Sequence, residues 1–436
     1  MKKIVTICGV LASLTSFSQQ IHRCATHEAI QHQETLAPGY LQNVNDAFNR
    51  AKDNYSRDRA TVYTIPVVFH VVYNNADENI PDNVLTDQIS VLNAAYGYTN
   101  ADQINLRDTF NTIVGSTDIQ FELATIGPDG NATNGITRTQ TSITEFGDIG
   151  FLQGDMSGVE RIKSSADGGQ DPWNQSRYLN IWVADMSISF GGQSVTALMG
   201  YATPPDNLSN WPAGSTGGLN DGVVIQYQAI GSNNPIQLDP GTGVINFEGK
   251  TCVHEVGHYL GLRHIWGDGD CNSQDGIDDT PNATENSQAI TNCDTLNNTC
   301  TDNIGTLGDL PNMQENYMDY SPESCQVAFT IGQSDLMRGV IETHRWELID
   351  NYPALSIANN NELNLSIYPN PSNGNITIQG TTTNGLIEVY SNNGQIISSV
   401  YTTNQKTTLN NLPTGVYFVR FSNETTVITK KITIIK

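Results

Sequence analysis

Three histidines and a glutamate near the middle of the chain have the spacing of a zinc site. Residues 251–264 read TCVHEVGHYLGLRH, which fits the pattern H-E-x-x-H-x-x-G-x-x-H. On a helix, residues four apart point within about 40° of each other, so His254 and His258 can bind one metal ion. Gly261 lets the chain turn back after the helix, and His264 then supplies a third imidazole. The sequence therefore predicts Zn²⁺ bound by these three histidines.

Glu255 gives this site a catalytic character. Three neutral imidazoles leave one tetrahedral position for water, as in catalytic rather than structural zinc sites. Zinc lowers the pKa of such a water, and Glu255 can take its proton as general base and pass it to the leaving amine. The pattern predicts hydrolysis of peptide bonds. The alternative is a His-Glu pair that forms an ordinary salt bridge on a helix surface. Such a pair would not require the other two histidines and the glycine at this spacing.

Outside the zinc motif, a downstream Met-turn pattern supports the site, whereas Cys252 and the remaining histidines do not fit as ligands. Downstream, residues 316–320 read NYMDY, which has the form of a Met-turn beneath such a zinc. Cys252 lies about 200° around the helix from His254, so we expect a buried free thiol rather than a ligand. The remaining histidines lack a ligand pattern and are expected to be ordinary surface or core residues: His22, His27, His32, His70 and His344.

The elements that must position the site alternate between strands and helices. Strands are predicted at 64–73, 119–124, 178–184 and 222–227, and helices at 84–96 and from near Phe247. This order predicts an α/β (α+β) catalytic domain with a mixed, twisted sheet and a zinc-binding helix beneath it. After residue 363, only short alternating strands follow, which predicts a small all-β sandwich.

The chain divides into five predicted parts. Residues 1–18 have the basic start, apolar core and small-x-small end of a secretion signal, and residues 19–58 form a polar propeptide with helical pieces at 43–53. The catalytic domain then covers 59–350, an Asn-rich linker 351–362, and the sandwich 363–436.

The net charge limits the kinds of partner that the protein can have, and the cysteines bear on its disulfides. The formal charge of −24 disfavours nucleic acid or an anionic membrane as a partner, and it suits basic peptide substrates or calcium. No segment after the signal is apolar enough to span a membrane, so we expect a secreted protein. Export permits disulfides, and four clustered cysteines allow three connectivities among which spacing does not choose: Cys271, Cys293, Cys300 and Cys325.

Residues 60–350 resemble the pappalysin family of metzincin zinc endopeptidases. The resemblance rests on the zinc motif, TIPVVFH at 64–70, DGIDDTP at 275–281 and NYMDYS at 316–321. It implies that Met318 forms the base under the zinc and that Tyr320 helps to stabilise the tetrahedral intermediate. It also implies disulfides that join Cys271 to Cys300 and Cys293 to Cys325.

The same resemblance implies a structural Ca²⁺. Its ligands would be the side chains of Asp275 and Thr280 and backbone carbonyls near Gln274 and Ile277, since calcium prefers hard oxygen donors. The alternative is a solvated acidic loop.

Related enzymes place an acidic residue at the floor of the S1′ pocket, where this chain has Glu323. The hypothesis is cleavage on the N-terminal side of Arg or Lys, so that self-cleavage at Ser56-Arg57 or Asp58-Arg59 would release the propeptide. Cys24 would hold the fourth zinc position until then, as in the cysteine switch of other metzincin zymogens. An unpaired thiol without a role is the alternative.

The C-terminal part resembles the sorting domain of the type IX secretion system of Bacteroidetes. SIYPNP at 366–371, GVYFV at 415–419 and KKITIIK at 430–436 carry this resemblance. It implies export across the outer membrane by that machinery, and a carbohydrate- or protein-binding module is the alternative. For the whole chain, the second hypothesis is a non-catalytic adhesin that keeps zinc for structure, and Glu255 favours the enzyme.

Overall fold

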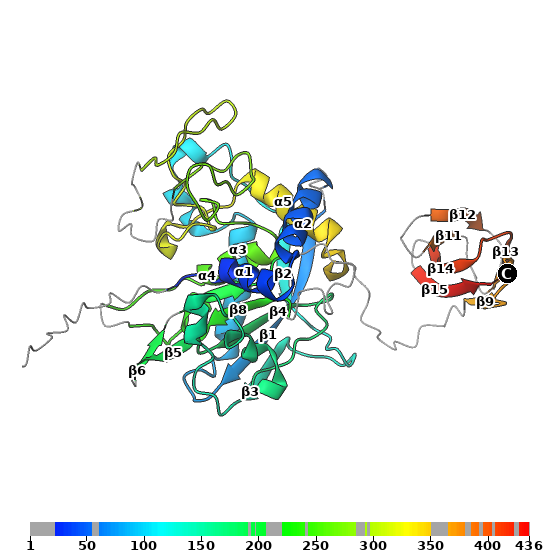
Figure 1. The fold of residues 1–436 in the computed structure, drawn as a ribbon, viewed down its shortest axis with the longest axis horizontal. Helices are drawn as coiled ribbons and strands as arrows, with labels where there is room; N and C mark the ends of the chain where they lie inside the picture. The colour runs from blue at the N-terminus through cyan, green and yellow to red at the C-terminus, as the bar shows by residue number, and fades with distance from the viewer. Residues whose placement is uncertain are drawn as a thin grey trace, which may run out of the picture. The chain divides into compact units, whose positions relative to one another are not determined.

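Figure 1 shows the fold in a computed structural model of the chain. The structure describes residues 22–54, 61–190, 193–196, 198–205, 220–239, 243–284, 293, 297–349, 365–379, 385–391, 396–402, 406–422 and 427–435. The predicted signal peptide, linker and cleavage points lie outside these ranges. The chain forms two compact units, Met1–Ala354 and Leu355–Lys436. Among the described residues, no helix is both long and apolar enough to cross a bilayer.

A mixed sheet forms the centre of the first unit. Its strand order is β2-β1-β4-β8-β7. Strand β1 is long enough to pair with two strands, its first half with β2 and its second half with β3. All pairings are parallel except that of β7 with β8. The bounds are β1 Tyr63–Tyr73, β2 Ile119–Leu123, β3 Ile136–Gln140, β4 Leu179–Ala184, β7 Gly200–Ala202 and β8 Val223–Gln226, with a separate hairpin of β5 Ser187–Phe190 and β6 Gln193–Thr196. The predicted mixed α/β architecture is confirmed.

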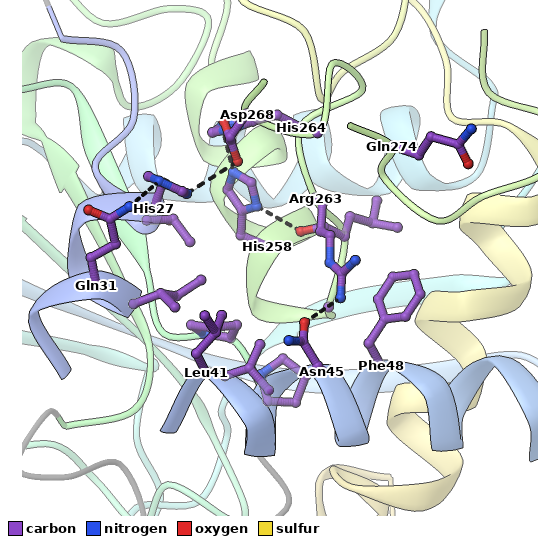
Figure 2. Close-up of a pocket in the computed structure, with 18 residues that line it drawn as sticks. His27, Gln31, Leu41, Asn45, Phe48, His258, Arg263, His264, Asp268 and Gln274 are labelled. Atoms are coloured by element: carbon purple, nitrogen blue, oxygen red, sulfur yellow. Dashed lines mark hydrogen bonds and ion pairs between the residues drawn. The ribbon is translucent and has the colours of Figure 1, made fainter. Parts of the chain in front are cut away.

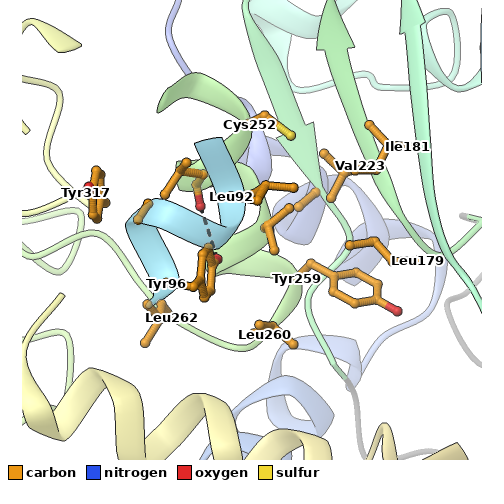
Figure 3. Close-up of a cluster of buried hydrophobic side chains, with 14 of the residues drawn as sticks. Leu92, Tyr96, Leu179, Ile181, Val223, Cys252, Tyr259, Leu260, Leu262 and Tyr317 are labelled. Atoms are coloured by element: carbon orange, nitrogen blue, oxygen red, sulfur yellow. Dashed lines mark hydrogen bonds between the residues drawn. The ribbon is translucent and has the colours of Figure 1, made fainter. Parts of the chain in front are cut away.

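The strands β4, β7 and β8 are buried on both faces, as near-continuous apolar strands require. One face packs against α3 (Asp82–Tyr96) and α4 (Lys250–Tyr259), where Leu92 and Cys252 meet Ile181 and Val223 (Figure 3). The hydroxyl of Tyr96 donates to the carbonyl of Val253 at 3.2 Å. This contact joins the zinc-motif helix to α3.

The zinc-motif helix α4 begins at Lys250 rather than near Phe247, so the predicted start was too early. Gly249 has φ of +76°, a left-handed conformation that a right-handed helix cannot contain. The helix therefore starts after this glycine.

Residues 22–54, called here the N-terminal segment, contain two helices. These are α1 (Thr26–Leu36) and α2 (Tyr40–Asn54), and α2 packs against α5 (Ile331–Thr343) of the same unit (Figure 1). Between the larger elements are short 3-10 helices: Ala101–Asn105, Asp108–Phe110, Ile149–Gln153, Val159–Lys163, Ser165–Asp167, Tyr227–Ala229, Glu323–Cys325 and Trp346–Leu348.

The second unit consists of two antiparallel sheets with one apolar core. The sheet orders are β13-β10-β9 and β12-β11-β14-β15. The bounds are β9 Ser366–Tyr368, β10 Ile376–Gln379, β11 Gly385–Ser391, β12 Ile396–Thr402, β13 Lys406–Leu409, β14 Gly415–Ser422 and β15 Val427–Ile434. Alternating inward residues such as Tyr417, Val419 and Phe421 fill the core, so the predicted β-sandwich is confirmed.

Candidate metal centre and active site

Three imidazoles converge at α4 and the turn that follows it. Nε2 of His258 lies 3.1 Å from Nε2 of His254 and 3.1 Å from Nε2 of His264. Ligand atoms of a tetrahedral zinc with bonds of about 2.0–2.1 Å lie roughly 3.3 Å apart, so this spacing fits zinc.

The other nitrogen of each ring, Nδ1, faces an oxygen atom: Tyr317 O for His254, Leu262 O for His258 and Asp268 Oδ1 for His264. Carbonyl and carboxylate oxygens only accept, so each Nδ1 carries the hydrogen and each Nε2 presents a lone pair. Burial lowers the pKa of His254 well below its usual range and that of His258 to about 3, which keeps these rings neutral. Three lone pairs directed at one buried point are the donor set of a cation such as zinc.

Glu255 is buried beside the imidazoles. Its Oε2 accepts hydrogen bonds from Thr26 Oγ1 at 3.2 Å and from Cys24 Sγ at 3.4 Å. Burial raises the pKa of Glu255 to about 8 while the N-terminal residues cover it. Gly200 of β7 makes room for this side chain, because a Cβ there would lie 2.9 Å from Glu255 Cγ.

Cys24 lies at the same point as the three histidines. Its Sγ and one nitrogen of each ring are all within 4.8 Å of one another. Residues 22–26 reach this position by running along the β7 edge, where Met199 N donates to His22 O and Ala25 N to Gly200 O, each at 3.0 Å. Burial raises the pKa of the Cys24 thiol well above its usual range, so a thiolate here needs a neighbouring cation.

Arg23 helps to line a small pocket beside the first residues of the zinc-motif helix. The pocket is lined by Lys250, Thr251, His254, Asp319, Tyr320, Glu323 and Gln326. Nη1 of Arg23 donates to Ser321 O at 2.8 Å. Burial lowers the pKa of Arg23, and the charges of Glu323 and Asp319 oppose that shift. Nothing in the sequence pattern indicated Arg23.

Glu323 lines this pocket, and it also caps the zinc-motif helix. Its Oε1 accepts from Thr251 N and Thr251 Oγ1, each at 2.7 Å, and its Oε2 accepts from Lys250 N at 3.2 Å and from Glu248 N. The N-cap residue itself, Gly249, has no side chain to satisfy these donors. A carboxylate far downstream in the sequence therefore stabilises the start of α4.

Met318 and Tyr320 lie below and beside the imidazoles. Met318 is fully buried under α4, and a Cβ on Gly257 would lie 2.5 Å from its sulfur. The ring of Tyr320 packs edge-on to that of His264, with centroids 4.9 Å apart. Its hydroxyl donates to the carbonyl of Cys24 at 3.2 Å, so in this structure Tyr320 is engaged by the N-terminal segment.

Asp268 is a residue of the site that sequence reasoning missed. It accepts from His264 through Oδ1, and its Oδ2 lies 3.5 Å from Nδ1 of His27 in the N-terminal segment (Figure 2). A carboxylate that holds the outer nitrogen of a metal-binding histidine fixes the ring and increases its basicity. The available signal was an acidic residue four positions after the third histidine of the motif.

Two predicted side-chain ligands of the calcium loop are buried. Asp275 and Thr280 are each 2% exposed, and Asp275 Oδ2, Asp279 Oδ1 and Thr280 Oγ1 have no hydrogen bond to the described residues. Ile277 O lies 3.5 Å from Thr280 N, while Gln274 lines the cavity of Figure 2. Buried oxygens without donors fit a hard cation such as calcium.

The structure joins Cys271 to Cys300 and Cys293 to Cys325. This is the pairing that the pappalysin resemblance implies. Cys252 is buried and free, and it faces the core rather than the imidazoles (Figure 3).

Comparison with known proteins agrees with this geometry. Residues 241–342 match the family model described as pregnancy-associated plasma protein-A, and residues 366–436 match that of a secretion system C-terminal sorting domain. The solved structure of a promirolysin point mutant from Tannerella forsythia is 34% identical with a TM-score of 0.59, over 75% of this chain and 96% of that chain.

The chain belongs to the pappalysin family.

Mature Tannerella forsythia mirolysin with a cleaved peptide is also similar to this pappalysin. It is 36% identical with a TM-score of 0.52, over 67% of this chain and 97% of that chain. An extracellular metalloprotease of Verticillium alfalfae is 27% identical over 344 residues, 78% of this chain and 96% of the relative. This pappalysin is therefore a secreted zinc metalloendopeptidase with a type IX sorting domain, and the predictions of family, enzyme class and export are confirmed.

Proposed function

We propose that this pappalysin is made as a latent precursor, uses Glu255 as general base, and cleaves before Arg or Lys. The observation that carries the proposal is that three neighbouring side chains engage three parts of one site. Cys24 lies against the imidazoles, Thr26 donates to Glu255, and Arg23 lines the adjacent acidic pocket. Substrate cannot reach the histidines while these contacts persist.

After the N-terminal segment leaves, the site has what peptide hydrolysis needs. Zinc, when bound by His254, His258 and His264, would polarise the scissile carbonyl and lower the pKa of water. Glu255 would take a proton from that water and deliver it to the leaving amine. The Tyr320 hydroxyl, released from Cys24 O, would donate to the developing oxyanion, while Met318 supports the site from below.

The preference for Arg or Lys at P1′ is supported by the negative charge around this pocket. Arg23 of the chain itself helps to line it, and the negative charges of Glu323 and Asp319 favour the charged form of this guanidinium. A substrate guanidinium in this pocket would be attracted by the same two carboxylates. Cleavage of a peptide library, read by mass spectrometry, tests this, and a preference for apolar P1′ residues would contradict it.

We also propose a structural calcium ion. Asp275 and Thr280 would supply side-chain oxygens, and Gln274 and Ile277 backbone carbonyls. The buried oxygens of Asp275 and Thr280 that lack donors support this assignment.

The proposed precursor has the predicted parts: signal 1–18, propeptide 19–58, catalytic domain 59–350, linker 351–362 and sorting domain 363–436. The match to promirolysin covers 75% of the chain and that to mature mirolysin 67%, which supports a propeptide at the N-terminus. Activation would cut Ser56-Arg57 or Asp58-Arg59, and the type IX machinery would export the precursor.

Cys24→Ala tests the latency. We expect the purified full chain to cleave casein without the lag shown by the unmodified precursor, because the site is no longer closed by sulfur. Cys252→Ala is the matched control, since it removes the other buried free thiol of the described residues and should leave the lag unchanged. A lag of unchanged length in Cys24→Ala would contradict the proposal.

A further inference from the structure

We propose that helix α2 of the N-terminal segment is a second anchor that works without zinc. Its docking surface on the catalytic unit would keep the segment bound after the chain is cut between residues 54 and 61. The occupant of this surface is the chain's own released segment. The inference rests on the proposed latency and adds that cleavage alone does not activate the enzyme.

The first observation is the apolar face of α2. Phe48 is 4% exposed and Ala51 fully buried, and both belong to the same core cluster as Leu336 and Val340 of α5. In this structure the segment is therefore part of the core of the catalytic unit. Releasing α2 would expose this apolar surface of α5 to water, which opposes dissociation.

The second observation is a set of polar contacts around Phe48. The guanidinium of Arg263 lies over the Phe48 ring, 4.0 Å from its centroid, and donates to Asn45 Oδ1 at 2.9 Å (Figure 2). The Phe48 ring also rests on Gly276, where a Cβ would lie 2.8 Å from Phe48 Cζ. These contacts fix the orientation of α2 as well as holding it.

The third observation is Lys52, one turn further along α2. Its Nζ donates to Gly276 O at 2.7 Å and to Asp278 Oδ1 at 2.9 Å. The α2 residues that make these contacts lie upstream of the cut, and their partners lie in the catalytic unit. Cutting the chain between them therefore breaks none of these contacts. Because α2 is joined through α1 to the residues in the active-site cleft, the released segment binds at two places at once and dissociates slowly.

The test uses full chains that carry Glu255→Ala and Cys24→Ala, so that neither activity nor the sulfur contributes. Residues 55–60 are replaced by the recognition sequence of a site-specific protease. After the cut, gel filtration measures how much segment elutes with the catalytic unit, and dilution measures its dissociation rate. We expect the segment to be retained, and prompt separation after the cut would overturn the proposal.

Two variants locate the anchor. Phe48→Ala should speed dissociation by about a hundred-fold or more, since truncating a buried Phe is among the costliest core substitutions. Lys52→Ala, whose side chain is 41% exposed and outside the core, should speed it by about ten-fold and covers the case that Phe48→Ala does not fold. The matched control is the exposed neighbour Asn49→Ala, which should leave the rate within about three-fold.

Equal rates for Phe48→Ala, Lys52→Ala and Asn49→Ala would overturn the proposal. Because these chains are inactive, the result is independent of whether Cys24 causes latency. That question is answered separately by casein cleavage with active chains.

Discussion

Glu323 has two roles in the structure, and substitution can separate them. Its carboxylate accepts four hydrogen bonds from residues at and just before the start of α4, and it lines a pocket together with Arg23. Glu323→Gln removes the charge and half of the acceptor capacity. Glu323→Asp keeps the charge on a side chain that is shorter by one methylene group.

The expected magnitudes follow from these contacts. A lost charged cap at a partly buried helix N-terminus costs about 1–2 kcal/mol, which corresponds to a fall of roughly 2–8 °C in Tm. A lost charge-assisted hydrogen bond to a P1′ guanidinium costs about 1.5–3 kcal/mol, or roughly 10- to 150-fold in kcat/KM. Glu323→Gln should show both losses. Glu323→Asp should keep the preference for Arg, because the charge remains. Its Tm should still fall, because the shorter side chain cannot reach all donors at the start of α4.

The assay compares kcat/KM for two quenched fluorescent peptides that differ only in Arg or Leu at P1′. The control is Glu347→Gln, which removes an exposed carboxylate away from the pocket. If Glu323→Gln keeps the Arg-to-Leu ratio within about three-fold of the unmodified enzyme, Glu323 does not select the P1′ residue. Asp319, which lines the same pocket, would then be the acidic residue that does.

Further predictions concern the metal sites and the core. Asp268→Asn should weaken zinc binding by about 10- to 100-fold in chelator competition, because it removes the carboxylate that holds His264, and unchanged affinity would refute that role. Gly257→Ala should lower stability by about 1–3 kcal/mol or more in urea unfolding, since its Cβ would lie 2.5 Å from the sulfur of Met318. Saturating calcium should raise the Tm of the chelated chain on the order of 5 °C at 100-fold excess over Kd, and the rise should vanish in Asp275→Asn. Burial lowers the pKa of His70 to about 4, below its ordinary 6.5, so its contribution of on the order of 3 kcal/mol is present above pH 6.5 and lost as the pH falls through 4. His70→Gln should remove that part of the acid sensitivity, and an unchanged pH profile would speak against it.

Features that depend on local spacing could be predicted from the sequence. His254 and His258 share one helix face, and His264 follows a glycine turn, so the three rings converge wherever the helix forms. The strands and α3 followed from apolar periodicity. The start of α4 was misjudged because a single left-handed residue, Gly249, decides it.

Contacts between distant segments could not be predicted in this way. Arg23 and Thr26 meet the site across more than 200 residues of sequence, and no spacing rule joins such partners. The same is true of Glu323 at the start of α4, which was expected only as part of a pocket. Local periodicity carries no information on which remote carboxylate satisfies an exposed helix end.

The most direct test of the central claim is casein cleavage by the activated enzyme, by Glu255→Ala and by the enzyme after chelation. The account predicts cleavage by the enzyme alone, a loss of at least about a hundred-fold in Glu255→Ala, and recovery of the chelated sample when zinc is returned. Equal cleavage in all three samples would contradict it.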